Sequence, residues 1–259
     1  MGIIGAGKIG GSLLVRLAES GRFELGVSDI HPEQLAPYAE DYGVRVFSSN
    51  QELAESTDLV IAAVKPWDVV AVSEGIRSAL EGTSKAVVSV AAGVPISAIE
   101  EKLAPGTPVL RVMPNVCVSV GLGSAVVTAN EAGQEMVPMV MEIFRSVGDV
   151  MELPERLFDA ATALHGSGPA YVALFADALI QAGVREGIPR DIARRLVNGT
   201  IQGTAVLLKE RSPHQVRDEV MTPGGTTAAA FVAMEKAGFV GAVYDGIHAA
   251  TEQSRGLGK

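Results

Sequence analysis

The chain has 259 residues, a formal net charge of −9 and a single cysteine. This length suits one large domain or two modest ones, and a chain of this size folds without metals or disulfides. One cysteine excludes an internal disulfide framework and a multi-thiolate metal site, so we expect no metal centre. The apolar runs fall far short of the roughly 20 residues that span a bilayer, and no basic leader is apparent. We therefore expect a soluble, cytoplasmic protein that does not bind membranes.

Acidic residues are concentrated in the first part of the chain. Residues 1–153 contain 10 basic residues (Lys and Arg) and 19 acidic residues (Asp and Glu), whereas residues 154–259 contain 11 basic and 11 acidic residues. Nucleic-acid binding needs several cations to neutralise phosphates, so this distribution argues against a nucleic-acid partner. If the first part binds a phosphate-bearing ligand, backbone amides must do much of the binding. Glycine, at 29 residues, is enriched over its usual share of about 7%.

Residues 1–153 alternate strand-like apolar runs with helical stretches, which favours a parallel sheet of βαβ units. The run 59–64 is of the fully buried kind that parallel sheets use, and Gly21 ends the first helical stretch. We therefore predict an α/β fold, with a Rossmann-like doubly wound sheet over residues 1–153. The predicted strands are 2–4, 23–28, 44–47, 59–64, 86–90, 109–113, 124–128 and 150–153. The predicted helices are 8–20, 32–41, 50–56 with Asn50 as its cap, 69–80, 96–103 and 131–147.

After Pro154 the pattern becomes entirely helical. The helix predicted at 169–186 is apolar on nearly every face, with only Asp177 and Gln181 polar in its middle. Such a helix must be buried on all sides, and a small domain has little room to do so alone. We therefore predict an all-helical dimerisation domain over residues 154–259, in an intertwined homo-oligomer. Its predicted helices are 155–164, 169–186, 189–209, 213–220, 225–237 and 239–256.

A glycine-rich turn follows the first predicted strand and opens the first helix. Its residues 5–10 have the GxGxxG spacing of a dinucleotide fingerprint in the required strand and helix context. Gly5 would make the tight turn, Gly7 would admit the pyrophosphate to backbone amides, and Gly10 would allow close packing of helix on strand. The helix N-terminus would stabilise the negative charge. The alternative is a glycine-rich turn without a ligand. The candidate cofactor-binding residues here are Ile4, Gly5, Ala6, Gly7, Lys8 and Ile9.

Asp29 ends the second predicted strand, 19 residues after Gly10. An acid about 20 residues on hydrogen-bonds the adenine ribose of NAD, whereas NADP usually calls for an arginine there. The segment 23–44 contains no Lys or Arg. The sequence therefore favours NADH over NADPH, although Ser28 and His31 could still serve a phosphate.

Two further loops lie at the carboxyl ends of predicted strands, where open α/β sheets bind ligands. Lys65 can reach a ribose or a substrate carboxylate from this position, and its alternative is a solvated surface lysine. Pro66 makes its loop rigid, and the small side chains of Ala91 and Ala92 leave room for a flat nicotinamide ring. The candidate cofactor-binding residues outside the glycine-rich turn are Asp29, Asn50, Ala63, Val64, Lys65, Pro66, Val90, Ala91 and Ala92.

Two Gly-Pro clusters, at 165–171 and 221–227, interrupt the predicted helices. The second is a Pro-Gly-Gly turn followed by Thr226 and Thr227. Such a turn exposes free backbone N–H groups at a helix N-terminus and adds two hydroxyls, which suits a small carboxylate. An ordinary N-cap with a threonine as the capping residue is the alternative.

Six segments stand in a fixed order along the chain: Ile4-Gly5-Ala6-Gly7, Ala63-Val64-Lys65-Pro66, Ser89-Val90-Ala91-Ala92-Gly93, Arg111-Val112-Met113-Pro114-Asn115, Gly166-Ser167-Gly168-Pro169-Ala170-Tyr171 and Pro223-Gly224-Gly225-Thr226-Thr227. Together they resemble the pyrroline-5-carboxylate reductase family, and the resemblance covers essentially the whole chain. It implies a Rossmann domain followed by a helical, substrate-binding domain that dimerises, often into rings of dimers, with an active site built from both subunits. It also implies that NAD(P)H transfers a hydride to a cyclic imine carrying one carboxylate, which gives L-proline in the last step of proline biosynthesis.

The same resemblance suggests roles for four residues. Gly225, Thr226 and Thr227 would hold the carboxylate or face the imine nitrogen. Thr227 matches the family threonine that hydrogen-bonds this nitrogen, and it is the candidate catalytic residue. Glu155 matches a substrate-proximal acid, although an acid at the start of a helix also stabilises the helix dipole.

Two positions depart from the family pattern. A serine or asparagine is more typical at Asp29, which puts the usual NADPH use of the family in doubt. Many members have serine at His165, whose side chain either titrates near the active site or fills the interdomain joint.

Two other functions are compatible with the pattern. A related Rossmann reductase could act on another cyclic ketimine or on a β-hydroxyacid, but the β-hydroxyacid enzymes normally use a lysine on a long helix of the second domain, and 169–186 contains none. A non-catalytic nucleotide-sensing module would need no second anion site facing the cofactor.

Overall fold

The computed structural model describes residues 1–257. Their contacts divide the chain into two compact units, one formed by Met1–Ser167 with the chain from His248, the other by Gly168–Ile247. None of the described helices is long and apolar enough to cross a membrane. The division into domains at residue 154 stays a prediction, and its last residues, 258 and 259, lie outside the described residues.

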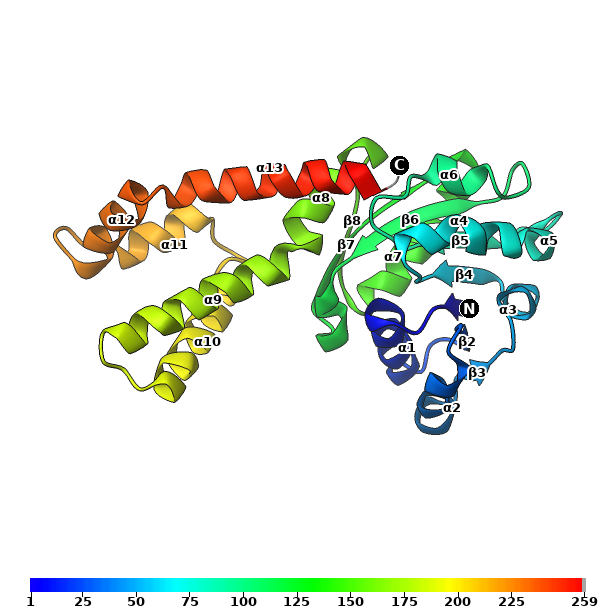
Figure 1. Cartoon of the computed structure of the whole chain (residues 1–259), viewed down its shortest axis with the longest axis horizontal. Coiled ribbons are helices and arrows are strands. Elements are labelled where there is room, and N and C mark those ends of the chain that lie inside the picture. The colour runs from blue at the N-terminus through cyan, green and yellow to red at the C-terminus, as the bar shows by residue number, and fades with distance from the viewer. Residues whose placement is uncertain (258–259) are drawn as a thin grey trace. The chain divides into compact units, whose positions relative to one another are not determined.

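An eight-stranded sheet forms the centre of the first unit (Figure 1). Its order, β3-β2-β1-β4-β5-β6-β7-β8, runs outward in both directions from β1, so the sheet is doubly wound as predicted. Strands β1 to β6 are parallel to one another. The strands are β1 (Gly2–Ile4), β2 (Gly26–Ser28), β3 (Arg45–Val46), β4 (Leu59–Ala62), β5 (Ala86–Ser89), β6 (Val109–Pro114), β7 (Gly123–Ala129) and β8 (Gly148–Glu152).

Strand β7 departs from the parallel sheet that the alternating pattern predicts. It pairs antiparallel with β6, and Leu110 lies opposite Ala129. The connection between them holds only a 3-10 turn at Val116–Val120, whereas a parallel crossover needs a dozen or more residues. The chain therefore turns back on itself, and β8 then pairs parallel with β7 after the helix α7 (Val137–Arg145).

Helices cover both faces of this sheet, and each face has its own apolar cluster. Adjacent residues of β1 belong to different clusters, because successive side chains of a strand point to opposite faces. Ile3 packs with Leu13 and Ile143, whereas Ile4 packs with Leu53 and Ile99. The helices of this unit are α1 (Lys8–Glu19), α2 (Ala36–Tyr42), α3 (Asn50–Ser56), α4 (Pro66–Gly75), α5 (Arg77–Leu80), α6 (Ile96–Glu100), α7 and α8 (Phe158–Ala161).

Several predicted boundaries move in the structure. The strand predicted at 23–28 covers only Gly26–Ser28, because its partner β1 is itself a short strand. The helix predicted at 69–80 begins at Pro66 and is interrupted at Ile76, where α4 ends. The helix predicted at 155–164 is instead a 3-10 turn at Glu155–Leu157, the short α8 and a π-helical turn at Thr162–Gly166.

The start of α3 corrects the predicted cap. Ser49, not Asn50, is the N-cap, and its hydroxyl accepts a hydrogen bond from the Glu52 N–H at 3.1 Å. Asn50 is the first helical residue, and its side-chain oxygen accepts a hydrogen bond from the Ser28 hydroxyl at 2.8 Å. The side chain of Asn50 therefore faces the end of β2 instead of the helix terminus.

The second unit is helical throughout. Its helices are α9 (Gly168–Arg185), α10 (Arg190–Leu207), α11 (Pro213–Val220), α12 (Thr226–Lys236) and the first half of α13 (Phe239–Leu257). Helices α9 and α10 pack side by side (Figure 1). Among residues 168–247 only Ala193 is buried, and Val172 and Leu174 on α9 are 52% and 71% exposed. The single chain therefore leaves uncovered the apolar faces that led us to predict an oligomer.

Candidate functional site

The turn after β1 has the backbone geometry that its three glycines predict. Gly5 has a φ of +96°, and a Cβ there would lie 2.7 Å from the Ala63 carbonyl oxygen. A Cβ at Gly10 would lie 1.9 Å from the carbonyl oxygen of Gly5. At Gly7, the N-cap of α1, a Cβ would meet no protein atom. A side chain at Gly5 or Gly10 would therefore clash with the protein backbone, whereas the position at Gly7 borders open space that a ligand could enter.

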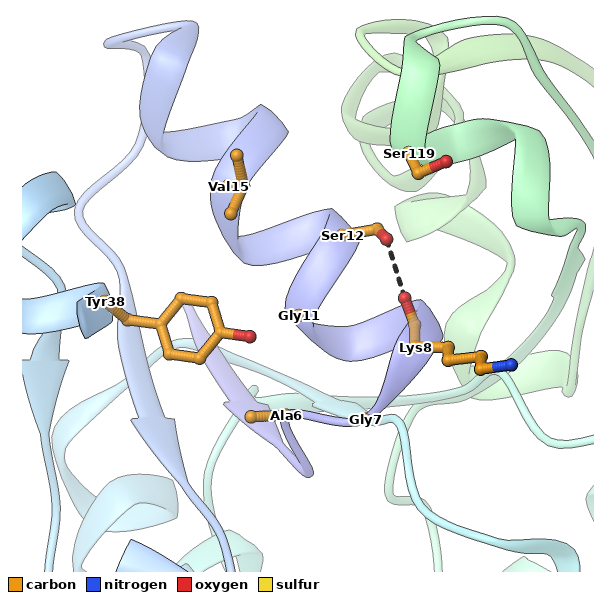
Figure 2. Close-up of a pocket in the computed structure, with 8 residues that line it drawn as sticks. All are labelled: Ala6, Gly7, Lys8, Gly11, Ser12, Val15, Tyr38 and Ser119. Atoms are coloured by element: carbon orange, nitrogen blue, oxygen red, sulfur yellow. Dashed lines mark hydrogen bonds between the residues drawn. The ribbon is translucent and has the colours of Figure 1, made fainter. Parts of the chain in front are cut away.

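That open space is a pocket at the N-terminus of α1. Figure 2 shows Ala6, Gly7 and Lys8 at the turn, with Gly11 and Ser12 further along the helix. The first hydrogen bond of the helix runs from the Gly11 N–H to the Gly7 carbonyl at 2.7 Å, and no side chain caps the terminus. The preceding amides are therefore left unpaired by the helix, and together with the helix dipole they favour an anion.

Gly11 is a position that the fingerprint did not single out. A Cβ there would lie 2.4 Å from the Tyr38 hydroxyl and 3.0 Å from the Ala6 carbonyl oxygen. Figure 2 shows the Tyr38 side chain reaching from α2 toward this part of α1. The sequence signal for Gly11 was the Gly10-Gly11 pair inside a predicted helix. Glycine is unfavourable in a helix, so its presence there suggests that a larger side chain would not fit.

Asp29 lies beside the glycine-rich turn. Its Oδ2 accepts a hydrogen bond from the Ala6 N–H at 2.7 Å, and its Oδ1 accepts one from the His31 N–H at 2.9 Å. The Ser28 hydroxyl next to it is buried and is bound to Asn50. The structure therefore brings Asp29 and Asn50 to the turn, and it also shows that the Ala6 amide is already engaged.

Two other predicted loops leave the sheet at the same edge. Lys65 is exposed and is the N-cap of α4, and Pro66 occupies the first helical position, where proline is favoured. The Ala63 N–H donates to the Ile4 carbonyl at 2.8 Å, which joins this loop to β1. Val90 and Ala91, after β5, are buried. Because β4 neighbours β1 and β5 neighbours β4, the candidate cofactor residues gather at one edge of the sheet.

Glu155 belongs to a polar cluster that only the structure reveals. Its Oε1 accepts hydrogen bonds from the Ile96 N–H at 2.7 Å and from Arg111 Nη1 at 3.2 Å. The Arg111 side chain is 4% exposed and that of Glu155 is 34% exposed. The guanidinium carbon lies 4.9 Å from the centroid of the Phe158 ring. A direct contact of Glu155 with substrate stays a prediction.

His165 bridges the π-helical turn and β6. Its Nδ1 lies 2.6 Å from the Ala161 carbonyl oxygen and its Nε2 lies 2.8 Å from that of Met113. The Asn115 side chain donates to the His165 carbonyl at 3.1 Å. Both ring nitrogens lie against backbone carbonyl oxygens of the first unit. This geometry favours a packing role for His165.

The Pro-Gly-Gly turn before α12 presents the predicted threonines. Gly224 has a φ of +69°, and Gly225 is the N-cap without any side-chain cap. The first helical hydrogen bond runs from the Ala229 N–H to the Gly225 carbonyl at 3.2 Å. Thr226 and Thr227 stand inside the first turn, so neither caps the helix and the capping alternative is wrong. Their amides precede that first bond and are left unpaired by the helix.

The doubly wound sheet and its glycine-rich turn are those of a Rossmann-type dinucleotide-binding domain. Residues 1–93 match the family model described as NADP oxidoreductase, coenzyme F420-dependent. Residues 155–257 match the model described as pyrroline-5-carboxylate reductase dimerisation. Within residues 1–257 no group of three or more His, Cys, Asp or Glu side chains is placed to hold a metal ion.

Comparison with individual proteins extends this match to the full length. The pyrroline-5-carboxylate reductase of Synechocystis is 38% identical over 100% of this chain and 98% of its own. The structure of the Coxiella burnetii pyrroline-5-carboxylate reductase superposes with a TM-score of 0.93 at 31% identity, and covers 100% of this chain and 98% of its own. The structure of the Plasmodium falciparum pyrroline carboxylate reductase, solved with NADP bound, superposes with a TM-score of 0.86 at 32% identity, and covers 100% of this chain and 97% of its own. The chain belongs to the pyrroline-5-carboxylate reductase family, which confirms the resemblance of the six segments.

Proposed function

We propose that this protein is a pyrroline-5-carboxylate reductase, which reduces the cyclic imine to L-proline with NAD(P)H in the last step of proline biosynthesis. The observation that carries the proposal is the full-length relationship to reductases of this name. The glycine-rich turn adds an independent physical argument, because a Cβ at Gly7 would meet open space where a ligand can approach the backbone.

The residues at the turn fit a dinucleotide. The free amides at the start of α1 would bind the pyrophosphate, and Asp29 would face the adenine ribose. The loops at 63–66 and 90–92 would border the nicotinamide ribose and ring. The bound cofactor would supply a hydride to the imine carbon.

The Thr226–Thr227 turn would bind the substrate. Its unpaired amides and helix N-terminus favour the carboxylate, and the Thr227 hydroxyl would hydrogen-bond the imine nitrogen. This bond would orient the imine and assist proton supply. We expect most of the rate enhancement to come from holding donor and acceptor in the right geometry, since no activated nucleophile is needed.

The proposal is tested by following oxidation of NADH and NADPH with pyrroline-5-carboxylate, beside a six-membered cyclic imine. We expect turnover of pyrroline-5-carboxylate with formation of proline. A preference for the six-membered imine would assign the chain to a related ketimine reductase. Turnover of neither imine, with intact cofactor binding, would contradict the proposal and favour a sensing module.

Asp29 is expected to favour NADH. Its carboxylate is held beside the turn by the Ala6 and His31 amides, so its negative charge would repel a 2′-phosphate on the adenine ribose. We expect Asp29→Asn to raise the ratio of kcat/KM for NADPH over NADH by about 10-fold, or roughly 1.4 kcal/mol. Asp41→Asn on α2 is the matched control. A wild-type preference for NADPH, or an unchanged ratio in Asp29→Asn, would contradict this role.

The uncovered helices of the second unit predict a homodimer or a ring of dimers. Val172 and Leu174 would be covered by a second copy of the chain, and the active site would draw on both subunits. Light scattering should therefore give at least twice the mass of the chain, and a stable monomer at micromolar concentration would contradict it. We include a cytoplasmic location in the proposal, to be checked by cell fractionation.

A further inference from the structure

Residues 90–95 join β5 to α6, and we call this segment the nicotinamide loop because its first residues are the proposed neighbours of the nicotinamide ring. A side chain from elsewhere in the chain holds its far end. At its start, β5 pairs with β4 and β6. At its end, Pro95 is the N-cap of α6 and has no side chain that can cap the helix. The Glu155 carboxylate instead accepts the Ile96 N–H at 2.7 Å.

Arg111 holds that carboxylate in place. Arg111 is 3% exposed, and Glu155 is its ion-pair partner at 3.2 Å. Its Nε and Nη2 have no hydrogen-bond partner among residues 1–257, and its guanidinium lies over the Phe158 ring. A buried charge whose single partner is removed costs several kcal/mol, so the pair is constrained to stay together. The same oxygen, Oε1, makes both contacts, so the ion pair with the buried guanidinium helps to hold that oxygen at the Ile96 N–H.

We propose that Arg111 and Glu155 are positioning residues, which fix the nicotinamide loop at the carboxyl edge of the sheet. The inference rests on the proposed function. Arg111 lies on β6, Glu155 in the turn after β8, and Ile96 at the end of the loop, so one carboxylate ties three segments together. The rate of hydride transfer depends steeply on the placement of donor and acceptor, and a small shift of the loop lowers it without removing any contact to the imine.

This role is distinguishable from direct substrate binding by Glu155. A residue that touches the imine carboxylate would chiefly change the KM for the imine. A residue that sets the nicotinamide loop would lower kcat and weaken binding of the reduced cofactor, while the KM for the imine stays close to that of the wild type. These parameters separate the two roles in the same variant.

The test compares Arg111→Met, Arg111→Lys and Glu155→Gln with the control Lys102→Met. The control removes an exposed ion pair with Glu74, at 4.0 Å, just beyond α6. We expect Arg111→Met and Glu155→Gln to lower kcat by 10- to 100-fold and to raise the Kd of the reduced cofactor, measured by its fluorescence without substrate, by several-fold. The KM for the imine should stay within about 3-fold, and Arg111→Lys should recover part of kcat.

The outcomes are separable. An increase confined to the KM for the imine in Glu155→Gln overturns the inference in favour of substrate contact. The inference is also overturned if the Arg111 variants fold and have the same kcat and the same cofactor Kd as Lys102→Met. If Arg111→Met does not fold, Arg111→Lys is judged by the same parameters. If the wild type turns over no imine, the proposed function fails, and the cofactor Kd of the variants still decides the role of the pair.

Discussion

Replacing Gly10 with alanine should both destabilise the fold and abolish cofactor binding. The new Cβ would lie 1.9 Å from the Gly5 carbonyl oxygen and 3.0 Å from the Ala63 side chain, so α1 would have to move away from the turn. Overpacking typically costs 1–3 kcal/mol, and we expect a loss in the free energy of unfolding of about 3 kcal/mol because the obstacle is backbone. Denaturant unfolding measures this loss, and titration with reduced cofactor measures the binding.

Gly7→Ala is the matched control within the same turn. Its Cβ would meet no protein atom, so we expect the free energy of unfolding to change by less than about 1 kcal/mol. The cofactor Kd should nevertheless rise by at least about 10-fold, because the side chain would occupy the space through which the pyrophosphate approaches the amides. Wild-type binding by Gly7→Ala would contradict the predicted position of the dinucleotide, and full stability of Gly10→Ala would contradict the close packing.

Removing the Thr227 hydroxyl should lower catalysis without disturbing the fold. Thr227 lies in the first turn of α12, at a terminus without a side-chain cap, so loss of its hydroxyl should not weaken the helix. We expect Thr227→Ala to lower kcat/KM for the imine by about 5- to 150-fold, which corresponds to roughly 1–3 kcal/mol for a lost hydrogen bond to a buried polar group. Steady-state kinetics with saturating cofactor measure this change.

Two variants make the result specific. Thr227→Ser keeps a hydroxyl and should recover most of the activity. Thr200→Ala removes a hydroxyl that is bound to the Leu196 carbonyl of its own helix at 2.9 Å, and it should leave kcat/KM unchanged. If Thr227→Ala retains wild-type kcat/KM, the predicted hydrogen bond to the imine nitrogen does not exist. An equal loss in both alanine variants would indicate a general disturbance of the helical unit.

The elements of the first unit were largely predictable because periodicity is a local property. Strand β4 and helix α1 were found from their own residues, and their bounds shifted only slightly. Strand β7 was found, but its direction was wrong. Direction depends on whether the preceding connection can cross over the sheet, and the 3-10 turn at Val116–Val120 is too short to do so.

The polar contacts of the candidate site were less predictable. Ser49, not Asn50, caps α3. Capping depends on backbone angles, which the sequence does not state. The acid at Asp29 was placed correctly at the end of β2, yet its engagement with the Ala6 amide was not visible in the sequence. The ion pair of Arg111 had one signal in the sequence, a charged residue in an apolar strand, because a buried charge requires a partner from elsewhere in the chain.

The sequence by itself determined the glycine-rich turn, the doubly wound sheet, the helical second half and the family. The turn and the alternation of strands and helices depend on residues a few positions apart, where glycine conformation and apolar spacing act directly. The family followed from six short segments in a fixed order along the chain. The tertiary structure decided which polar groups meet: Asp29 with Ala6, 23 residues apart, and Glu155 with Ile96, 59 residues apart. Such pairs form only after the strands and helices have packed, because packing alone brings distant segments to one edge of the sheet.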